Sequence, residues 1–543
     1  MESARQRLRG PWSARPLAVH LHALIARERL AYVAVFAVAL TLRLVALGDR
    51  PLHHDESVHA WLTWLLITGH GYEYNPVFHG PVQFYLDALG YLVARVGATG
   101  VRLMPAIAGS VITMLPYFLR RQLGQTAALS ASALLCISPS YLYFSRFARE
   151  DIYAASLTLA VLVVVVRFLE RPRRWHPAAL LALLAASFAT KETTFITSFV
   201  AGTFLAGAVG YQVRRGRARG EEMRSAPILQ VVRSVGGDAW IWAATSFAAV
   251  FTLLFTTFLL RPQGLRTALY DSLSYWLSQQ PVNRGGQPWF YYLAVLAAYE
   301  LPVLVLAAVG IITSLRRPTL LRLYLVWSAT LNLVVYSWAS ERMPWLVLHL
   351  LLPLVLLAGV GLQTLWEGRH TLRAAAIAFA AAGAAFLLWG AVNVAYLHPA
   401  DPAELLVFTQ TSIQSDAVRE AILQADQRTL AAAHRHATIQ VDSWEGTAWP
   451  WAFYLRDLPV QYTDMRGPFM PDADIVVVDD SDRSRVLPHL AGYTGSRFHL
   501  REWWVVDWGG ASVGDAFRWF TRREAWSAKG TLDQWLYVRM DTP

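Results

Sequence analysis

The sequence has few charged side chains, two lysines and one cysteine. Only 16% of its 543 residues are charged, whereas 55% are hydrophobic and the mean hydropathy is +0.33. Soluble domains carry about 25% charged residues, so this composition excludes an ordinary soluble protein and predicts an integral membrane protein. The single cysteine, Cys136, excludes an intrachain disulfide, and its place inside an apolar run predicts a small buried side chain.

The positive charge is concentrated in short arginine clusters. The formal net charge is +10, but these clusters separate apolar runs, which is the pattern of cytoplasmic loops in membrane proteins. We therefore expect the lipid bilayer as a partner and no nucleic acid. Both lysines, Lys191 and Lys529, lie outside the clusters, and the apolar surroundings of Lys191 make it a candidate functional residue.

About eleven apolar segments are long enough to cross a bilayer. They cover residues 30–47, 101–119, 126–143, 152–168, 176–190, 193–212, 239–260, 289–315, 319–339, 343–365 and 373–396. The basic leader before the first segment contains Arg5, Arg7, Arg9, Arg15, Arg27 and Arg29. Since the later arginine clusters fall on the same side as this leader, we predict a multi-pass protein of the cell membrane whose N-terminus is cytoplasmic.

The chain divides near residue 398 into a transmembrane domain (1–398) and a C-terminal domain (399–543). In the C-terminal domain we predict helices at 403–430 and 447–456, and strands at 437–442, 459–463, 474–478, 498–507 and 534–540. This alternation is typical of a soluble α/β domain. An odd number of spans places that domain outside the cytoplasm. The predicted fold class is therefore a mainly α, polytopic membrane protein with an extracytoplasmic α/β domain.

The first outer segment, residues 49–100, contains two stretches too short to span a membrane comfortably. One is a helix predicted to begin near Asp55, which would sit at or near its N-cap, and the other runs from Pro81 to Val96. Both are predicted to lie in the membrane interface. Residues 263–279 have apolar side chains at near-helical spacing and predict a further surface helix or lid.

Polar clusters stand at the predicted outer ends of the spans. They are His53-His54-Asp55-Glu56, Arg146 to Asp151, Lys191-Glu192 and Ser340-Glu341-Arg342, with His79 as a fifth point. The predicted topology brings them to one side of the membrane at one depth. Two interpretations stay open, namely a functional site or a network of structural ion pairs such as Lys191 with Glu192. In the same way, Asp55 either caps its helix or takes part in chemistry.

Carboxylates and cations together suit transfer from a donor that carries a phosphate. A carboxylate can remove a proton from an attacking hydroxyl, and Arg, Lys or His can stabilise the charge on a phosphate leaving group. An amphiphile with a phosphate head group would place its phosphate at the depth of these clusters. A hydrophobic groove between spans would then take its tail.

The clusters form a series of motifs along the chain. They are Arg43-Leu44, Pro51 and Asp55-Glu56, then Phe78 to Val82, Arg149-Glu150-Asp151, Ala189-Thr190-Lys191, and Glu341 to Leu346 with His349. The series resembles the GT-C membrane glycosyltransferases, in the branch of protein O-mannosyltransferases and lipid A aminoarabinose transferases (family 39-like). Where the latter have a lysine that contacts the lipid phosphate, this chain has His79. The last motif is similar to a subgroup described as flippase activity-associated.

The resemblance implies inverting transfer of a sugar from polyprenyl phosphate to a protein, lipid or glycan acceptor. It implies that Asp55 is the base or positions the acceptor, with support from Glu56 and His54. The remaining substrate-binding candidates are His79, Arg149, Asp151, Lys191, Glu341 and Arg342. A metal is optional, and Asp151 with Asp55 offers oxygen ligands for Mg²⁺ or Mn²⁺. The alternative is a non-catalytic protein that binds lipid-linked sugars or assists a flippase.

Tryptophans are dense in the predicted C-terminal domain. They are Trp444, Trp449, Trp451, Trp503, Trp504 and Trp508. These rings either stack on sugars, seat the domain on the lipid interface, or pack in the core and at the domain junction. The packing interpretation has at least as much support from the sequence as the other two.

Overall fold

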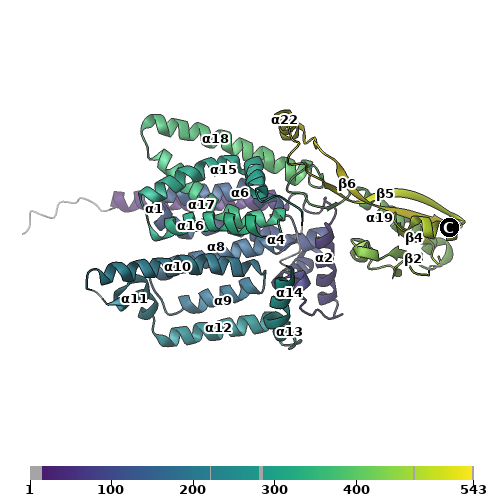
Figure 1. Cartoon of the computed structure of the whole chain (residues 1–543), viewed down its shortest axis with the longest axis horizontal. Coiled ribbons are helices and arrows are strands. Elements are labelled where there is room, and N and C mark those ends of the chain that lie inside the picture. The colour runs from purple at the N-terminus through teal and green to yellow at the C-terminus, as the bar shows by residue number, and fades with distance from the viewer. Residues whose placement is uncertain (1–14, 221, 280–284, 469–470, 541–543) are drawn as a thin grey trace, which may run out of the picture.

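The computed structural model describes residues 15–220, 222–279, 285–468 and 471–540. A bundle of long helices forms most of the molecule, and the C-terminal domain extends from one end of it (Figure 1). A mainly helical body followed by a C-terminal α/β domain is the predicted fold class, which is thereby confirmed. The basic leader predicted at Arg5, Arg7 and Arg9 lies outside the described residues.

All eleven predicted spans are helical. The helices are α1 (Arg15–Leu44), α4 (Ala98–Val111) continued by η2 (Ile112–Leu119), α6 (Gln125–Ile137) with α7 (Pro139–Ser145), α8 (Asp151–Glu170), α9 (His176–Phe188), α10 (Thr193–Arg217), α12 (Gly237–Phe255), α15 (Tyr291–Arg316), α16 (Leu320–Trp338), α17 (Val347–Trp366) and α18 (His370–Val392). Among the described residues, eight helices are long and apolar enough to cross a membrane, or nine spans if the pair α6–α7, bent by 57°, counts as one. The other two predicted spans are α1 and α9, and α9 has only 13 residues. Cys136, on α6, is buried as predicted.

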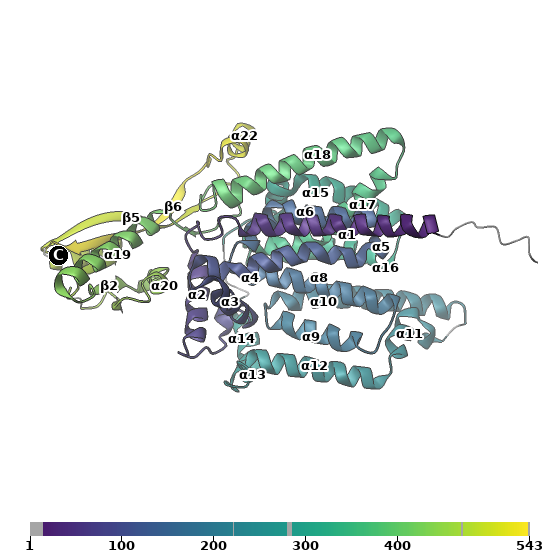
Figure 2. The same ribbon diagram turned by 180° about the vertical axis from the view of Figure 1, so that it is seen from behind.

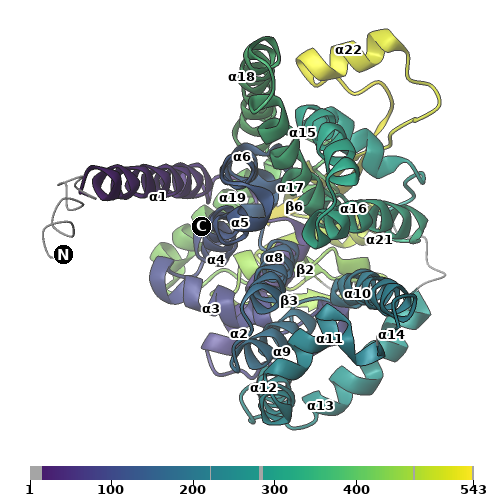
Figure 3. The ribbon, with the colours of Figure 1, turned by 90° about the vertical axis from the view of Figure 1, so that its left-hand side faces the viewer.

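Helix α17 is the centre of the bundle. Helices α6, α8, α15, α16 and α18 all pack against it (Figure 3), and it is buried along nearly its whole length. A Cβ added at Gly310 of α15 would lie 1.9 Å from the carbonyl oxygen of Leu357, and one at Gly361 of α17 would lie 2.0 Å from that of Leu306. The α15 and α17 backbones therefore touch, which small residues permit in membrane bundles.

Short helices lie across the end of the bundle that adjoins the C-terminal domain. They are α2 (His54–Ile67) and α3 (Val82–Ala94), with α13 (Gly264–Arg266), η4 (Thr267–Asp271) and α14 (Ser272–Gln279) nearby (Figure 2). The surface helices predicted for the first outer segment and for residues 263–279 are thus present. The arginine-rich connection that contains α11 (Pro227–Ser234) lies at the opposite end of the bundle (Figure 1).

The C-terminal domain is built on a six-stranded sheet with the order β1-β5-β6-β4-β2-β3. Its strands are β1 (Gln410–Thr411), β2 (Ile439–Asp442), β3 (Val460–Thr463), β4 (Ile475–Asp479), β5 (Tyr493–Trp504) and β6 (Lys529–Arg539). Strands β3, β2 and β4 are parallel, whereas β4, β6, β5 and β1 pair antiparallel. Helices α19 (Gln414–Ala433), α20 (Trp451–Tyr454), α21 (Arg483–Val486) and α22 (Val513–Arg522) complete the domain. The five predicted strands are present, with shifted ends.

The helix predicted at 403–430 begins only at Gln414. Tertiary contacts hold the preceding residues in an irregular path: Glu404 accepts hydrogen bonds from Tyr299 of α15 and from Nε of Arg523, and Gln410 and Thr411 pair with β5. The helix predicted at 447–456 is reduced to α20, Trp451–Tyr454. Pro450 has no backbone N–H and disfavours a helical conformation of the residue before it.

The C-terminal domain docks on the first outer segment of the bundle. The backbone N–H of Leu52 donates to the hydroxyl of Tyr454 (2.8 Å), and Nε2 of Gln410 donates to the carbonyl of Pro51 (3.1 Å). Among the tryptophans, Trp451 is fully buried, and the indole N–H of Trp508 donates to Gln287 before α15 (3.1 Å). For these two rings the packing interpretation describes the structure.

Candidate active site

The first turn of α2 is capped by His53 and Glu56. The backbone N–H of Asp55 donates to Nδ1 of His53 (3.0 Å), and the backbone N–H of His53 donates to Oε2 of Glu56 (2.9 Å). Together these contacts make a capping box. Asp55 thus lies in the first turn, near the N-cap as predicted, but the capping acceptor is the side chain of His53 and not that of Asp55. The Asp55 carboxylate is left for other contacts.

Glu56 holds the surrounding elements together. Its fully buried carboxylate accepts hydrogen bonds from Nε and Nη2 of Arg102 (both 2.7 Å) and from Nη2 of Arg50 (3.2 Å). It also accepts from the backbone N–H of Ala148 (2.9 Å). Burial raises the pKa of Glu56, but the two arginines outweigh burial and hold the pKa below its ordinary value. Glu56 thus ties α2 to α4 and to the loop before α8.

A cavity of about 320 Å³ lies beside the first turn of α2, at the junction of the bundle and the C-terminal domain. Five of the nine predicted site residues line it, namely His54, Asp55, His79, Arg149 and Glu341. The Asp55 side chain is 28% exposed, whereas that of Arg149 is 6% exposed. The structure therefore brings together residues from three of the predicted outer segments, as the predicted topology implies.

Arg149 pairs directly with Asp55. Its Nη1 donates to Oδ2 of Asp55, and its guanidinium carbon lies 3.9 Å from the ring centroid of Trp345. Burial raises the pKa of Asp55, but the charge of Arg149 outweighs burial and holds the pKa well below its ordinary value. The carboxylate is therefore ionised at neutral pH and can accept a hydrogen bond from a hydroxyl.

Asp151 and Lys191 form a buried ion pair outside the lining of the cavity. The Nζ atom of Lys191 lies 2.9 and 2.8 Å from the two carboxylate oxygens of Asp151, and neither side chain is more than 2% exposed. Nε of Arg149 lies 3.6 Å from Asp151 and 3.5 Å from Glu150. The structural ion-pair interpretation thus describes Lys191, although its partner is Asp151 and not the neighbouring Glu192.

His79 connects the cavity to Glu192. Its Nδ1 lies 2.9 Å from Oε2 of Glu192, and its Nε2 lies 3.2 Å from Nη2 of Arg149. The ring stacks on Trp276 of α14, with the centroids 5.2 Å apart. Burial lowers the pKa of His79, but Glu150 and Glu192 raise it to a net value above the ordinary one. His79 therefore stays protonated to a higher pH than a free histidine.

Arg342 lies away from the cavity. Its Nε donates to the carbonyl of Ser337 (3.0 Å), and its Nη1 donates to the carbonyl of Gln287 (2.8 Å). These bonds tie the end of α16 to the segment before α15. The predicted site residues outside the lining are Glu56, Asp151, Lys191 and Arg342.

The other lining residues were not among the predicted site residues, and they include His59, Trp345 and Arg501. His59 follows Asp55 by four residues on one helix, so the shared helix face could have indicated it. Trp345 belongs to the last motif of the series, Glu341 to Leu346. Arg501 comes from β5 in the other domain, and no local signal marks it.

The predicted pair of Asp55 and Asp151 does not fit a divalent metal. Asp55 is bound by Arg149 and Asp151 by Lys191, so each carboxylate already has a cationic partner. Within the described ranges, no group of three or more His, Cys, Asp or Glu side chains is arranged to hold a metal ion. Mg²⁺ and Mn²⁺ prefer several oxygen ligands in an octahedral arrangement, which these donors do not supply.

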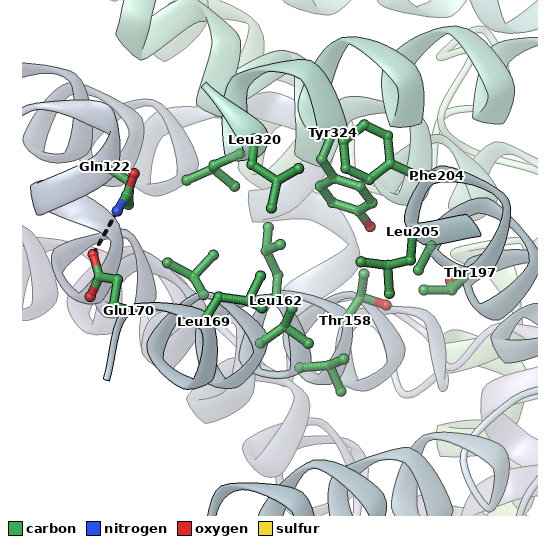
Figure 4. A pocket seen from close by; sticks show the side chains of 15 residues that line it. Gln122, Thr158, Leu162, Leu169, Glu170, Thr197, Phe204, Leu205, Leu320 and Tyr324 are labelled. Atoms are coloured by element: carbon green, nitrogen blue, oxygen red, sulfur yellow. Dashed lines mark hydrogen bonds between the residues drawn. The ribbon is translucent and has the colours of Figure 1, made fainter. Parts of the chain in front are cut away.

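An apolar groove of about 200 Å³ lies between α8, α10 and α16 (Figure 4). A hydrogen bond from Gln122 to Glu170 (2.9 Å) crosses one end, and Thr158 and Thr197 line the other end. The side chains between them are leucine, valine and aromatic residues. Thr158 lies about 10 Å along α8 from its first residue, Asp151. The groove therefore begins close to the buried ion pairs.

Comparison with protein families gives one partial match. The family model described as dolichyl-phosphate-mannose-protein mannosyltransferase matches residues 78–215. This stretch contains His79, Arg149, Asp151 and Lys191. No curated protein sequence matches the chain.

Two solved membrane enzymes have similar structures. ArnT from Cupriavidus metallidurans gives a TM-score of 0.60 in the apo state and 0.58 bound to undecaprenyl phosphate, with 16% and 15% identity, and both comparisons cover 86% of this chain and 95% of that protein. The oligosaccharyltransferase of Archaeoglobus fulgidus, tethered to an acceptor peptide, gives 0.53 at 13% identity and covers 87% of this chain and 72% of that protein. Its complex with Zn and sulfate gives 0.51 at 15% identity, with 79% and 61% covered.

The structural similarity extends over the bundle and into the C-terminal domain, since it covers 86% of the chain. It agrees with the motif series and with the partial family match. The resemblance inferred from the sequence is confirmed at the level of the fold: this chain has the fold of the GT-C membrane glycosyltransferases.

Proposed function

We propose that this protein is a polyprenyl-phosphate-dependent glycosyltransferase that acts at the outer face of the cell membrane. The observation that carries the proposal is the cavity in which an ionised carboxylate, Asp55, meets the guanidinium of Arg149 beside the imidazole of His79. The structurally similar ArnT is bound to undecaprenyl phosphate, and the similar oligosaccharyltransferase is tethered to an acceptor peptide by a disulfide bond. The first supports a lipid-linked donor, and the second supports a protein among the possible acceptors, which are a protein, a lipid or a glycan.

In the proposed reaction, an acceptor hydroxyl attacks the anomeric carbon of the donor sugar. A bond forms between the hydroxyl oxygen and this carbon, while the bond from the carbon to the phosphate oxygen breaks and its electron pair leaves with polyprenyl phosphate. Attack from the side opposite the phosphate inverts the configuration. Asp55 takes the hydroxyl proton. As Asp55 loses its negative charge, the phosphate replaces it as the partner of Arg149.

The apolar groove between α8, α10 and α16 is the proposed site of the polyprenyl chain. Helix α8 begins at Asp151 and α10 begins at Thr193, so both lead from the polar end of the bundle into the groove. Aliphatic and aromatic side chains line it, as an isoprenoid chain requires.

The proposed orientation follows from the arginine-rich connection at the end of the bundle far from the cavity (Figure 1). The positive-inside rule assigns that end to the cytoplasm. The cavity and the C-terminal domain would then face outwards, with α2 and α3 lying in the membrane interface.

One observation favours the alternative of a protein that binds lipid-linked sugars without chemistry. The ion pair with Arg149 makes Asp55 a weak base, because the pKa of Asp55 is held low. Transfer therefore requires that donor binding draws Arg149 towards the phosphate, whereas a binding protein has no such requirement.

Asp55→Asn tests the proposal, because asparagine keeps the shape of the side chain but cannot take the proton. With undecaprenyl-phosphate sugars as donors, we expect the transfer rate to fall by about 100-fold or more, while lipid binding is retained. The matched control is Asp49→Asn, since Asp49 is exposed and precedes the cavity residues. Near-parental turnover in Asp55→Asn would remove the base role. A parent that binds these lipids but transfers none of the sugars would favour the binding protein.

A further inference from the structure

Arg501 reaches from β5 of the C-terminal domain into the lining of the cavity that contains Asp55. Its side chain is 8% exposed. Nη2 donates to the carbonyl oxygens of Gly446 (2.7 Å) and Trp449 (3.1 Å), which fixes the guanidinium against the turn after β2. Nε is buried without a hydrogen-bond partner. Nη1 donates no hydrogen bond to any described residue.

The other buried arginines of the described chain have partners that account for their charge or their donors. Arg50, Arg102, Arg149 and Arg523 each pair with a carboxylate. Arg43 and Arg146 lack a carboxylate, but each uses both terminal nitrogens to bind backbone carbonyls. Arg501 has neither arrangement, and in the described ranges no carboxylate oxygen lies within the 4.0 Å of an ion pair. A buried cation without a counter-charge is destabilising, so this position points to an anionic ligand.

The charges around Arg501 leave its guanidinium available to bind an anion. Burial lowers the pKa of Arg501 to about 10, with Asp55 and Asp479 acting in the opposite direction, so the guanidinium is charged at neutral pH. The charge of Asp55 is already compensated by Arg149. Glu341 is the other acidic residue of the lining and is partly exposed to solvent.

His54 adds a second unpartnered group from the opposite side of the domain junction. Its Nδ1 is buried without a hydrogen-bond partner. Burial first, and then the charge of Arg501, lower the pKa of His54 to about 3, so its ring is neutral. Both side chains meet at the same turn: Arg501 binds the carbonyl of Gly446, and a Cβ added at Gly446 would lie 3.6 Å from Cε1 of His54.

We propose that Arg501 binds the phosphate of the lipid-linked donor, so that the C-terminal domain completes the donor site. This inference rests on the proposed function, in which polyprenyl phosphate is the anion brought to the cavity. Guanidinium groups suit phosphate because they are weakly hydrated and present several N–H donors in one plane. Lys191 and Arg342 are weaker candidates for the same role, since their donors are used within the protein.

The experiment compares two lipids that differ only in the charged group. Binding of undecaprenyl phosphate and of uncharged undecaprenol is measured for the parent, Arg501→Gln and Arg501→Lys in nanodiscs. We expect the parent to prefer the phosphate, and Arg501→Gln to lose about 10- to 100-fold in affinity for the phosphate but not for the alcohol. Arg501→Lys, which keeps the charge without the planar group, is expected to fall between them. It also replaces Arg501→Gln if that variant does not fold.

The matched control is Arg497→Gln on the same strand. Arg497 is 53% exposed and pairs with Asp533 and Asp480, so its loss is expected to leave both affinities unchanged. A further arm measures inorganic phosphate, and a parent that binds it as tightly as the lipid phosphate would overturn the assignment to the donor.

The remaining outcomes separate this inference from the proposed function. A parent that binds both lipids equally would overturn the donor class and the Arg501 site together. A parent that prefers the phosphate, with the preference intact in Arg501→Gln, would overturn the Arg501 site alone. If Arg501→Gln does not fold, a fully parental affinity of Arg501→Lys for the phosphate would overturn it.

Discussion

Glu56→Gln separates a structural carboxylate from a catalytic one. Glutamine keeps the shape and one acceptor oxygen, but it removes the negative charge that compensates Arg102 and Arg50, which are 1% and 7% exposed. Removing one partner of a buried ion pair typically costs about 3–5 kcal/mol. Domains are usually stable by about 5–15 kcal/mol, so a loss near the lower value of about 3 kcal/mol is readily measured.

The pH dependence of stability follows from the same contacts. The folded state holds the pKa of Glu56 below its ordinary value, so the carboxylate stabilises the protein above the unfolded pKa of about 4.3. This contribution is lost as the pH falls through the folded pKa. The difference between the parent and Glu56→Gln should therefore be full at neutral pH and shrink in acid.

The assay is chemical unfolding in mixed micelles, with donor binding and turnover measured on the folded fraction. The control Glu367→Gln changes an exposed carboxylate that accepts a hydrogen bond from Gln363, and it should alter the free energy of unfolding by less than about 0.5 kcal/mol. If Glu56→Gln unfolds like the parent but loses turnover by about 100-fold, Glu56 acts in the chemistry and our structural assignment is refuted.

Two further predictions concern the neighbouring cations. Lys191→Met should lower the free energy of unfolding by about 3 kcal/mol or more, because it leaves Asp151 without its closest cation. The folded fraction should still bind undecaprenyl phosphate. Lost lipid affinity at parental stability would instead indicate that Lys191 binds the phosphate. Glu192→Gln should destabilise the protein below about pH 6.5, because Glu192 helps to raise the pKa of His79 in the folded state. The difference in the free energy of unfolding between the parent and Glu192→Gln should diminish as the pH rises through the folded pKa of His79. Unfolding curves between about pH 5.5 and pH 9 check it. A difference that grows with pH would contradict the ion pair of His79 with Glu192.

The helices of the bundle could be predicted from the sequence because each is specified by its own residues. Continuous apolar runs mark the spans, and near-helical spacing marks 263–279. The predictions failed where distant contacts override the local pattern. Residues 403–413 have a helical pattern, but Glu404 and Gln410 are held by other elements. Asp55 was placed at or near the N-cap of α2, and the structure shows that His53, two residues earlier, supplies the capping acceptor.

The candidate site was only half predictable for the same reason. The motif series placed Asp55, Arg149 and His79 at one end of the bundle, and the structure gathers them at one cavity. The series could not distinguish these residues from Lys191 and Arg342, which look equally functional in the sequence. Their roles depend on which partner each charge meets.

The sequence by itself determined that this chain is a multi-span helical protein with a C-terminal α/β domain, because hydrophobic periodicity is a local property. Only the tertiary structure decided how the charges are shared. Glu56 is enclosed by two arginines, Lys191 is paired with Asp151, and Arg501 arrives from the other domain without a counter-charge. Ion pairing falls off with distance and depends on burial, and both quantities are fixed only when segments far apart in the chain have packed together.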